Sequence, residues 1–188
     1  MNQGKKFEKQ IKASCDKQEI FIIRFNDTSL SWEHEDSSRF TPESPCDYLI
    51  YNKPYLFAIE CKSTCYSSMS IQKLGETGKN YMVKSHQIQS LINFSLHDGV
   101  YAGLLVNFRN DSDISDNTTY FWPIDEVSDF LCFSPKKSFN KHDVEKNGGI
   151  LLSQKLLRVN YLYDINKMLK DIILKDNKRK EDSDGTSI

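Results

Sequence analysis

The stretch that decides the fold is PCDYLIYNKPYLFAIECK, residues 45–62. Two apolar runs, residues 48–51 and 55–59, flank the turn-forming residues 52–54. Turn residues between two apolar runs are typical of a β-hairpin. With the turn centred near Lys53 and Pro54, the two strands should pair residues whose numbers sum to about 107. That register predicts that Asp47 faces Glu60.

Charged residues in this hairpin form a candidate metal site. Facing Cβ atoms in a β-ladder lie roughly 4.5–5.5 Å apart, and strand alternation puts Glu60 and Lys62 on one face with Cys61 on the other. Two carboxylates at that separation repel each other unless a cation joins them or one of them binds a proton. Mg²⁺ prefers oxygen ligands, and a water bound to it can attack a phosphodiester. We therefore expect Mg²⁺, with Mn²⁺ as a substitute, at Asp47 and Glu60, and we expect Lys62 to orient the water or to neutralise charge on the phosphoryl oxygens.

An exposed cross-strand charge ladder is the alternative for Glu60 and Lys62. The pattern E-x-K is common by chance and is weak evidence by itself. Its context favours a site, because Phe57 and Ile59 make the surrounding strand apolar, where charge is costly.

Two further polar residues border apolar helix stripes. Gln87 precedes Leu91 by four positions in a helix expected over residues 85–96, where its amide could reach the metal or its water. Glu8 lies beside the apolar stripe of a helix expected near the N-terminus. The alternatives are a buried amide satisfied by backbone for Gln87 and simple solvent exposure for Glu8.

Lysines in the loops around the cleft that we expect at this metal site are candidates for phosphate contacts. A loop lysine is most often only solvated, so these are expectations from position alone. The five are Lys73, Lys79, Lys84, Lys136 and Lys137.

The rest of the chain predicts an α/β fold with a central mixed sheet flanked by helices. A buried strand is expected over 19–25, a long polar loop over 26–45, another over 63–83, and a central strand over 100–108 with 119–122 beside it. Asp125 should cap a short helix, and Asp164 should cap the last helix. From Lys175 onward the chain is charged and predicts a disordered tail, 175–188.

Composition limits the class of protein to which the chain can belong. With 188 residues, 38% hydrophobic and 27% charged, the chain suits one globular domain, 1–174, and not a collagen, a coiled coil or a disordered protein. The 25 basic residues nearly cancel the 26 acidic ones, which excludes a uniformly cationic nucleic-acid sleeve. Five cysteines fit reduced thiols, and no apolar run suits a bilayer or a signal peptide. We expect a cytoplasmic protein without a membrane partner.

The segment Pro45-Cys46-Asp47, a turn and Glu60-Cys61-Lys62 resembles the PD-(D/E)xK nuclease signature, with one residue inserted between Pro and Asp. More specifically, the order of features from residue 4 to 163 is similar to that of the RecU-type Holliday junction resolvases. The matching features are Gly4-x-x-x-Glu8, Asp47-Tyr48, Glu60-x-Lys62, His86-Gln87, Asp98-Gly99 and Lys137-Ser138.

The resemblance implies a restriction-endonuclease-like nuclease core. By motif match, Asp47, Glu60 and Gln87 would bind Mg²⁺ and Lys62 would stabilise the transition state, with Glu8 as a further catalytic candidate. It also implies a homodimeric enzyme that cleaves Holliday junctions or other branched DNA in recombination and repair. Where that family has a basic stalk, residues 26–46 are acidic here, so we expect junction recognition from the spacing of two clefts and from the basic loops.

Two other functions stay open from the sequence. One is a restriction-type or repair-type nuclease that acts on linear duplex. The other is a DNA-binding protein that keeps the fold without catalysis.

Overall fold

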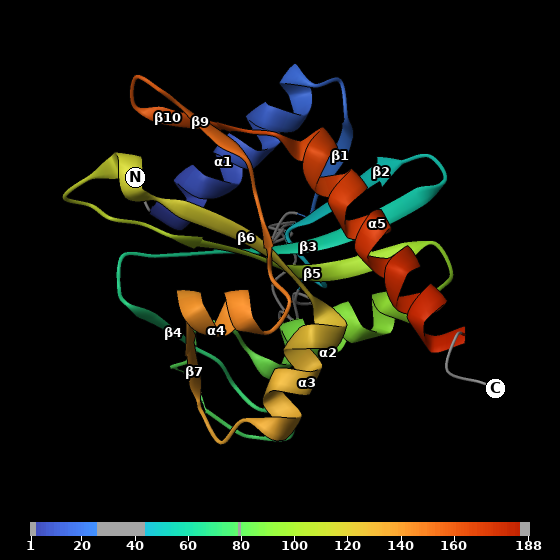
Figure 1. Ribbon diagram of the computed structural model, residues 1–188. Coiled ribbons are helices and arrows are strands. Elements are labelled where there is room, and N and C mark those ends of the chain that lie inside the picture. Colours follow the sequence, from blue (N-terminus) through green and yellow to red (C-terminus); the bar gives the residue numbers. More distant parts are fainter. Residues whose placement is uncertain (1–2, 26–43, 79, 185–188) are drawn as a thin grey trace, which may run out of the picture.

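A mixed six-stranded sheet forms the centre of the structure, a computed structural model that describes residues 3–25, 44–78 and 80–184 (Figure 1). The strand order is β1-β2-β3-β5-β6-β8, in which β3 and β5 are parallel and the other neighbours are antiparallel. The strands are β1 (Phe21–Arg24), β2 (Tyr48–Asn52), β3 (Tyr55–Thr64), β5 (Val100–Phe108), β6 (Thr118–Pro123) and β8 (Ile150–Leu151). The predicted α/β class with a central mixed sheet is confirmed.

The hairpin of β2 and β3 has the predicted register. Tyr48 pairs with Ile59 and Asn52 with Tyr55. On its other side, β3 runs parallel to β5 along its length, from the pair Leu56 and Val100 onward. The hairpin strand that carries Glu60 and Lys62 is therefore fixed inside the sheet, between two hydrogen-bonded neighbours.

Helices cover both faces of the sheet (Figure 1). On one face lie α1 (Gln3–Lys17), α5 (Ile165–Asp184) and the small hairpin of β9 (Gln154–Leu157) and β10 (Asn160–Tyr163). On the other face lie α2 (Ser85–Ser95), α3 (Ile124–Phe133), α4 (Lys141–Lys146) and the paired strands β4 (Ser68–Ser70) and β7 (Ser138–Asn140). A 3-10 turn, η1 (Ile114–Asp116), precedes β6. The two helical layers create two apolar cores, one on each face.

Local sequence explains three of the helices, α1, α2 and α5. In α1, Phe7, Ile11 and Cys15 recur at helical spacing and are buried, as predicted. In α2, Ile88 and Leu91 face the core. The last helix begins as predicted, because Lys167 N donates to the side chain of Asp164 at 3.0 Å.

Three predicted elements differ in the structure. The strand expected to be buried over 19–25 is an exposed edge strand, with Phe21 60% and Ile23 47% exposed, because apolar composition does not fix a strand's place in a sheet. Residues 63–83 are not one loop, since β3 continues to Thr64 and β4 pairs with β7. Helix α3 begins after Pro123, not at a cap formed by Asp125.

The C-terminal segment also differs from the prediction of a tail from Lys175. Helix α5 continues to Asp184. Its charged residues form ion pairs with α3 and within the helix: the amine of Lys175 lies 3.0 Å from Glu126 Oε1, and Lys180 pairs with Asp176 of the same helix at 2.8 Å. Those ion pairs, and helical propensity, extend the helix although it has few apolar residues there. Residues 185–188 lie outside the described part of the chain, as does the acidic segment 26–43.

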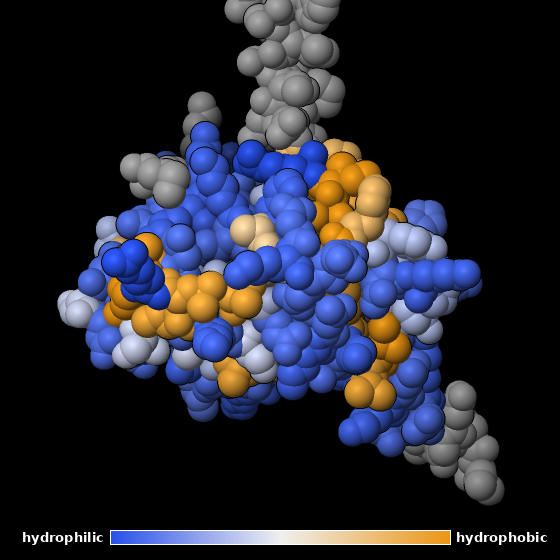
Figure 2. All heavy atoms as spheres, turned by 90° about the horizontal axis from the view of Figure 1, so that it is seen from above, coloured by the Kyte–Doolittle hydropathy of each residue, from blue (hydrophilic) through white to orange (hydrophobic). Residues whose placement is uncertain are grey.

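The face formed by α1 and the β9–β10 hairpin is mostly hydrophilic (Figure 2). Apolar side chains gather on it in separate patches, and Leu157 and Val159 of that hairpin are among the exposed apolar residues of the chain.

Among the described residues, no helix combines the length and the apolar character needed to cross a bilayer.

Candidate active site

The hairpin places the carboxylate of Asp47 against β3. Asp47 N donates to Ile59 O at 3.1 Å, and Asp47 Oδ2 accepts a hydrogen bond from Cys61 N at 2.7 Å. The ladder of β2 and β3, continued by one position, puts Asp47 opposite Glu60. The backbone of β3 thus fixes the Asp47 carboxylate beside the strand that carries Glu60.

Glu60 and Lys62 share one face of β3, and Cys61 is buried in the core on the opposite face. The amine of Lys62 lies 2.9 Å from Glu60 Oε1. Glu60 is only 3% exposed. This burial excludes the exposed charge ladder, because a surface pair would leave both groups in water.

Burial changes the acidity of both carboxyls, and neighbouring charges add to it. Burial, followed by the charge of Glu60, raises the pKa of Asp47 to about 7. Burial also raises the pKa of Glu60, although the nearby Lys62 amine opposes that rise. Near neutral pH the pair therefore has a high affinity for a positive charge, whether a proton or a metal ion.

The donor set suits a hard divalent cation. Throughout residues 3–25, 44–78 and 80–184, no three His, Cys, Asp or Glu side chains converge as metal ligands. Mg²⁺ is commonly held by one or two carboxylates while it keeps several waters. Asp47 and Glu60 together fit that requirement, and they are the residues that would hold the ion.

Gln87 lies at the first turn of α2 and contacts Glu60 directly. Lys84 N donates to Gln87 Oε1 at 3.0 Å, and Gln87 Nε2 donates to Glu60 Oε1. Because a backbone N–H can only donate, the amide oxygen must face Lys84 and the NH₂ group must face Glu60. The sequence predicts a metal ligand here, and that role stays a prediction: in this arrangement the amide oxygen accepts from Lys84 N while the NH₂ group faces Glu60.

Glu8 lies near the carboxylate pair without joining it. Its Oε2 lies 2.5 Å from Arg24 Nη2, and its side chain is 17% exposed. The charge of Glu8 contributes to the raised pKa of both Asp47 and Glu60. The structure therefore places Glu8 within electrostatic range of the site, as the ion-pair partner of Arg24.

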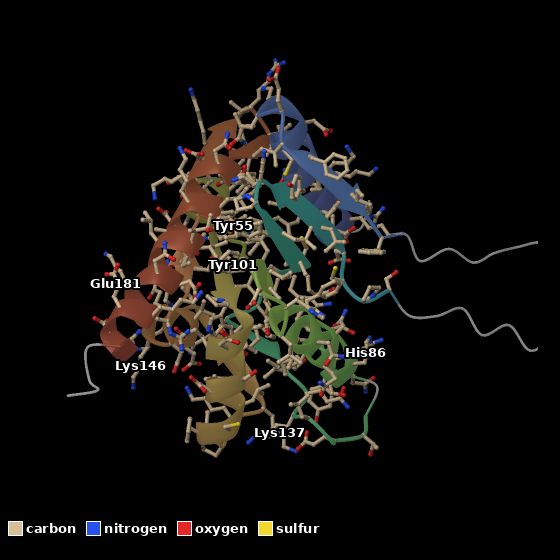
Figure 3. The ribbon with its side chains drawn as sticks, turned by 90° about the vertical axis from the view of Figure 1, so that its right-hand side faces the viewer. Tyr55, His86, Tyr101, Lys137, Lys146 and Glu181 are labelled. Atoms are coloured by element: carbon tan, nitrogen blue, oxygen red, sulfur yellow. The ribbon has the colours of Figure 1, made fainter. Side chains whose placement is uncertain are left out.

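Four of the predicted phosphate-contacting lysines belong to the segments that lead into α2 and β7: Lys73, Lys84, Lys136 and Lys137. Lys73 Nζ donates to Ser134 O at 2.8 Å, and Ile71 N donates to Lys137 O at 3.0 Å, which joins the segment before α2 to the segment before β7. Figure 3 shows Lys137 at the same lower end of the molecule as His86 of α2.

Two of these lysines have acidic partners. Lys136 pairs with Asp143 at 2.6 Å and Lys137 with Glu76 at 2.8 Å. Lys84 is exposed at the N-cap of α2, and Lys79 lies outside the described residues. A phosphate bound at Lys136 or Lys137 would either share the amine with the carboxylate that it now contacts or displace that carboxylate.

The sequence reasoning missed Gln72. It is 5% exposed, and its Oε1 accepts a hydrogen bond from Ser85 N at 3.0 Å. Residues 63–83 show no helical or strand periodicity that marks one amide as buried. The available signal is the pair of apolar residues Ile71 and Val83, which form an isolated β-bridge beside it.

Comparison with known proteins gives three findings. No family model matches this sequence. The chain is 28% identical over 193 residues to the SPbeta prophage-derived uncharacterized protein YotM of Bacillus subtilis (strain 168), a match that covers 95% of this chain and 90% of that protein. It is also similar to the solved structure of Hjc, a Holliday junction resolvase of Archaeoglobus fulgidus, with a TM-score of 0.48 and 14% sequence identity over 79% of this chain and 95% of that chain. The assignment of the site therefore rests on its own geometry and motifs.

Proposed function

We propose that this protein is a Mg²⁺-dependent DNA endonuclease that hydrolyses phosphodiester bonds. One observation carries the proposal: Asp47, Glu60 and Lys62 meet at a buried point of the hairpin, where burial holds the carboxyl pKa values high. Three ionisable groups at such a point are costly for stability, which is typical of a catalytic site.

Each residue has a definite part in this chemistry. When bound, Mg²⁺ would supply an activated water and neutralise phosphoryl charge. Asp47 and Glu60 would hold the ion between the strands. Lys62, whose amine lies 2.9 Å from Glu60 Oε1, would donate to a phosphoryl oxygen on which negative charge increases in the transition state.

The proposed substrate is branched DNA, such as a four-way junction, in recombination or repair. This part of the proposal is supported by the collinear motifs shared with the RecU-type resolvases, from Gly4 to Lys137-Ser138. A junction has paired strands to cut, so a homodimer with two active sites suits it. The basic end of the molecule, with Lys73, Lys84, Lys136 and Lys137, would contact phosphates. Lys79, which lies outside the described residues, is a further candidate from the sequence.

A cleavage assay tests the proposal. The purified chain is incubated with a four-way junction, a linear duplex of the same sequence and single strands, each with Mg²⁺, with Mn²⁺ and with EDTA. We expect Mg²⁺-dependent cleavage, faster on the junction. Equal rates on junction and duplex would favour a restriction-type or repair-type nuclease, and binding without cleavage in Mg²⁺ would favour a non-catalytic DNA-binding protein.

A further inference from the structure

A glutamine from outside α2 holds the N-terminus of that helix. The side chain of Lys84, at the N-cap, makes no capping hydrogen bond with the helix. Instead Gln72 Oε1 accepts from Ser85 N at 3.0 Å, while Gln72 Nε2 donates to Glu76 O at 2.6 Å. Both ends of this buried amide are therefore engaged, one by the helix and one by the preceding loop.

The backbone around Gln72 is also fixed. Gln72 N donates to Val83 O at 2.9 Å, and Val83 N donates to Ser70 O at 3.0 Å. These bonds join residues 70–72 to the residues that lead into α2. Gln72 thus has little freedom to move relative to the start of the helix.

The same helix start holds the side chain that contacts Glu60. Lys84 N fixes Gln87 Oε1 at 3.0 Å, which turns the Gln87 NH₂ group toward Glu60 Oε1. Gln72 is thus connected to the Glu60 carboxylate by its hydrogen bond to Ser85 N, the backbone between Ser85 and Lys84, and the two hydrogen bonds of Gln87. A displacement of the first turn would move Gln87, and with it the donor that orients Glu60.

We propose that Gln72 is a positioning residue of the candidate active site, acting through the first turn of α2 and Gln87 to orient the Glu60 carboxylate. The catalytic part of this inference rests on the proposed function, whereas the orientation of Gln87 does not. Partners that orient a ligating group commonly change metal affinity or activity by about 10- to 100-fold when they are removed.

The chain provides a matched control in Gln18. Gln18 Oε1 accepts from Asn166 N, in the first turn of α5, at 3.0 Å, and Gln18 Nε2 donates to Ser14 O and Tyr163 O at 2.8 and 2.7 Å. Gln18 therefore supports a helix start as Gln72 does, but it supports α5, on the other face of the sheet from Glu60. Gln18→Met removes the same kind of contacts without touching α2.

The experiment compares Gln72→Met, Gln72→Glu and Gln18→Met with the wild-type chain. The first measurement is the NMR resonance of the Gln87 side-chain NH₂ group, in the protein without DNA or added metal. We expect Gln72→Met to move this resonance toward the position of a solvent-exposed glutamine. Gln18→Met should leave it in place, and Gln72→Glu, which keeps an acceptor for Ser85 N, should restore most of the wild-type position.

The second measurement is DNA cleavage over a series of DNA concentrations and, at saturating DNA, over a series of Mg²⁺ concentrations. We expect Gln72→Met to lower kcat about tenfold or to raise the half-saturating Mg²⁺ concentration about tenfold, with KM for DNA unchanged. Melting temperatures of Gln72→Met and Gln18→Met should both fall, because both variants lose hydrogen bonds to backbone groups.

The outcomes separate this inference from the proposed function. If the Gln87 resonance and the Mg²⁺ dependence change no more in Gln72→Met than in Gln18→Met, Gln72 only stabilises the fold and the inference is wrong. If the resonance moves but the wild-type chain cleaves no DNA, the positioning of Gln87 by Gln72 stands and the nuclease assignment fails. If Gln72→Met does not fold, Gln72→Glu decides between the outcomes. A Gln72→Glu chain that folds normally, with the Gln87 resonance and the cleavage rate unchanged, supports the role of residue 72 as the acceptor for Ser85 N. A Gln87 resonance at the position of an exposed glutamine overturns that role.

Discussion

The side-chain amide of Gln87 donates a hydrogen bond to Oε1 of Glu60, which joins the first turn of α2 to strand β3. The amine of Lys62 lies 2.9 Å from that same oxygen. Two donors on one carboxylate oxygen fix its direction, so Glu60 is oriented toward its neighbours before any substrate arrives. This preorganisation underlies the predictions for the site.

The first prediction concerns the carboxylate pair. Asp47→Ala or Glu60→Ala should abolish DNA cleavage and leave DNA binding largely intact, because phosphate contacts and not the metal ion supply most of the affinity. Cleavage assays and gel shifts on the same preparations measure the two effects. Normal turnover by both variants would contradict the site assignment.

The second prediction concerns Lys62. Lys62→Ala should lower kcat by about a hundredfold or more, because it removes charge stabilisation in the transition state, and it should leave the fold intact. Lys12→Ala is a suitable control, since Lys12 forms an exposed ion pair with Asp16 at 2.8 Å on α1. A rate equal to that of the control would assign Lys62 a purely structural ion pair with Glu60.

The third prediction concerns pH and stability without metal. Burial and the charge of Glu60 raise the pKa of Asp47 from 3.8 to about 7. Between those values the folded chain binds more protons than the unfolded chain, so the Asp47 contribution to stability decreases as pH rises through that window. Asp47→Asn cannot ionise, and it should melt at a higher temperature than wild type at pH 8, with a difference that shrinks toward pH 4.

Added Mg²⁺ gives the complementary measurement. An ion that binds only the folded carboxylate pair should raise the melting temperature of the wild-type chain at pH 8, and it should have little effect on Asp47→Asn. Equal shifts in both proteins would mean that the ion binds elsewhere.

The fourth prediction concerns the basic end of the molecule. Replacing Lys136 and Lys137 together by alanine should weaken binding to both junction and duplex and should reduce the salt dependence by about one unit of slope for each lysine that contacts a phosphate. Alanine is preferable to charge reversal, because Asp143 and Glu76 already lie beside these amines. Salt-titrated gel shifts measure the slope.

Deletion of residues 27–36 is the comparison for that prediction. Their sequence is acidic, and they lie outside the described residues. We expect the deletion to leave the preference for a junction over a duplex nearly unchanged, because acidic residues add few phosphate contacts. Loss of junction preference on this deletion alone would identify the acidic segment as the recognition element.

The fifth prediction concerns the packing of β5 on β6. A Cβ atom added at Gly103 would lie 2.5 Å from Trp122 O and 2.6 Å from the Phe121 ring. Neither neighbour can withdraw easily, because both belong to the adjacent strand and are fully buried. Gly103→Ala should therefore reduce the free energy of unfolding by about 1–3 kcal/mol, measured by chemical denaturation. An unchanged value would show that β6 can move aside at this point.

The sequence by itself determined the hairpin and the positions of its charged residues. Residues 52–54 allow a tight turn between two apolar runs, and the two-residue period of a strand then fixes the face and partner of each side chain. For this reason the register of Asp47 against Glu60, and the shared face of Glu60 and Lys62, follow from local sequence. Helix α2 follows in the same way from its apolar spacing, as does the start of α5 at Asp164.

Only the tertiary structure decided the contacts between elements distant in the sequence. The orientation of the Gln87 amide depends on Lys84 N and Glu60 together, and the burial of Gln72 depends on where residues 70–72 meet the start of α2. The exposed position of β1 and the continuation of α5 through its ion pairs with the rest of the fold depend likewise on neighbours from other segments. Local periodicity reports which face of an element is apolar, but it contains no information about which distant polar group that face will meet.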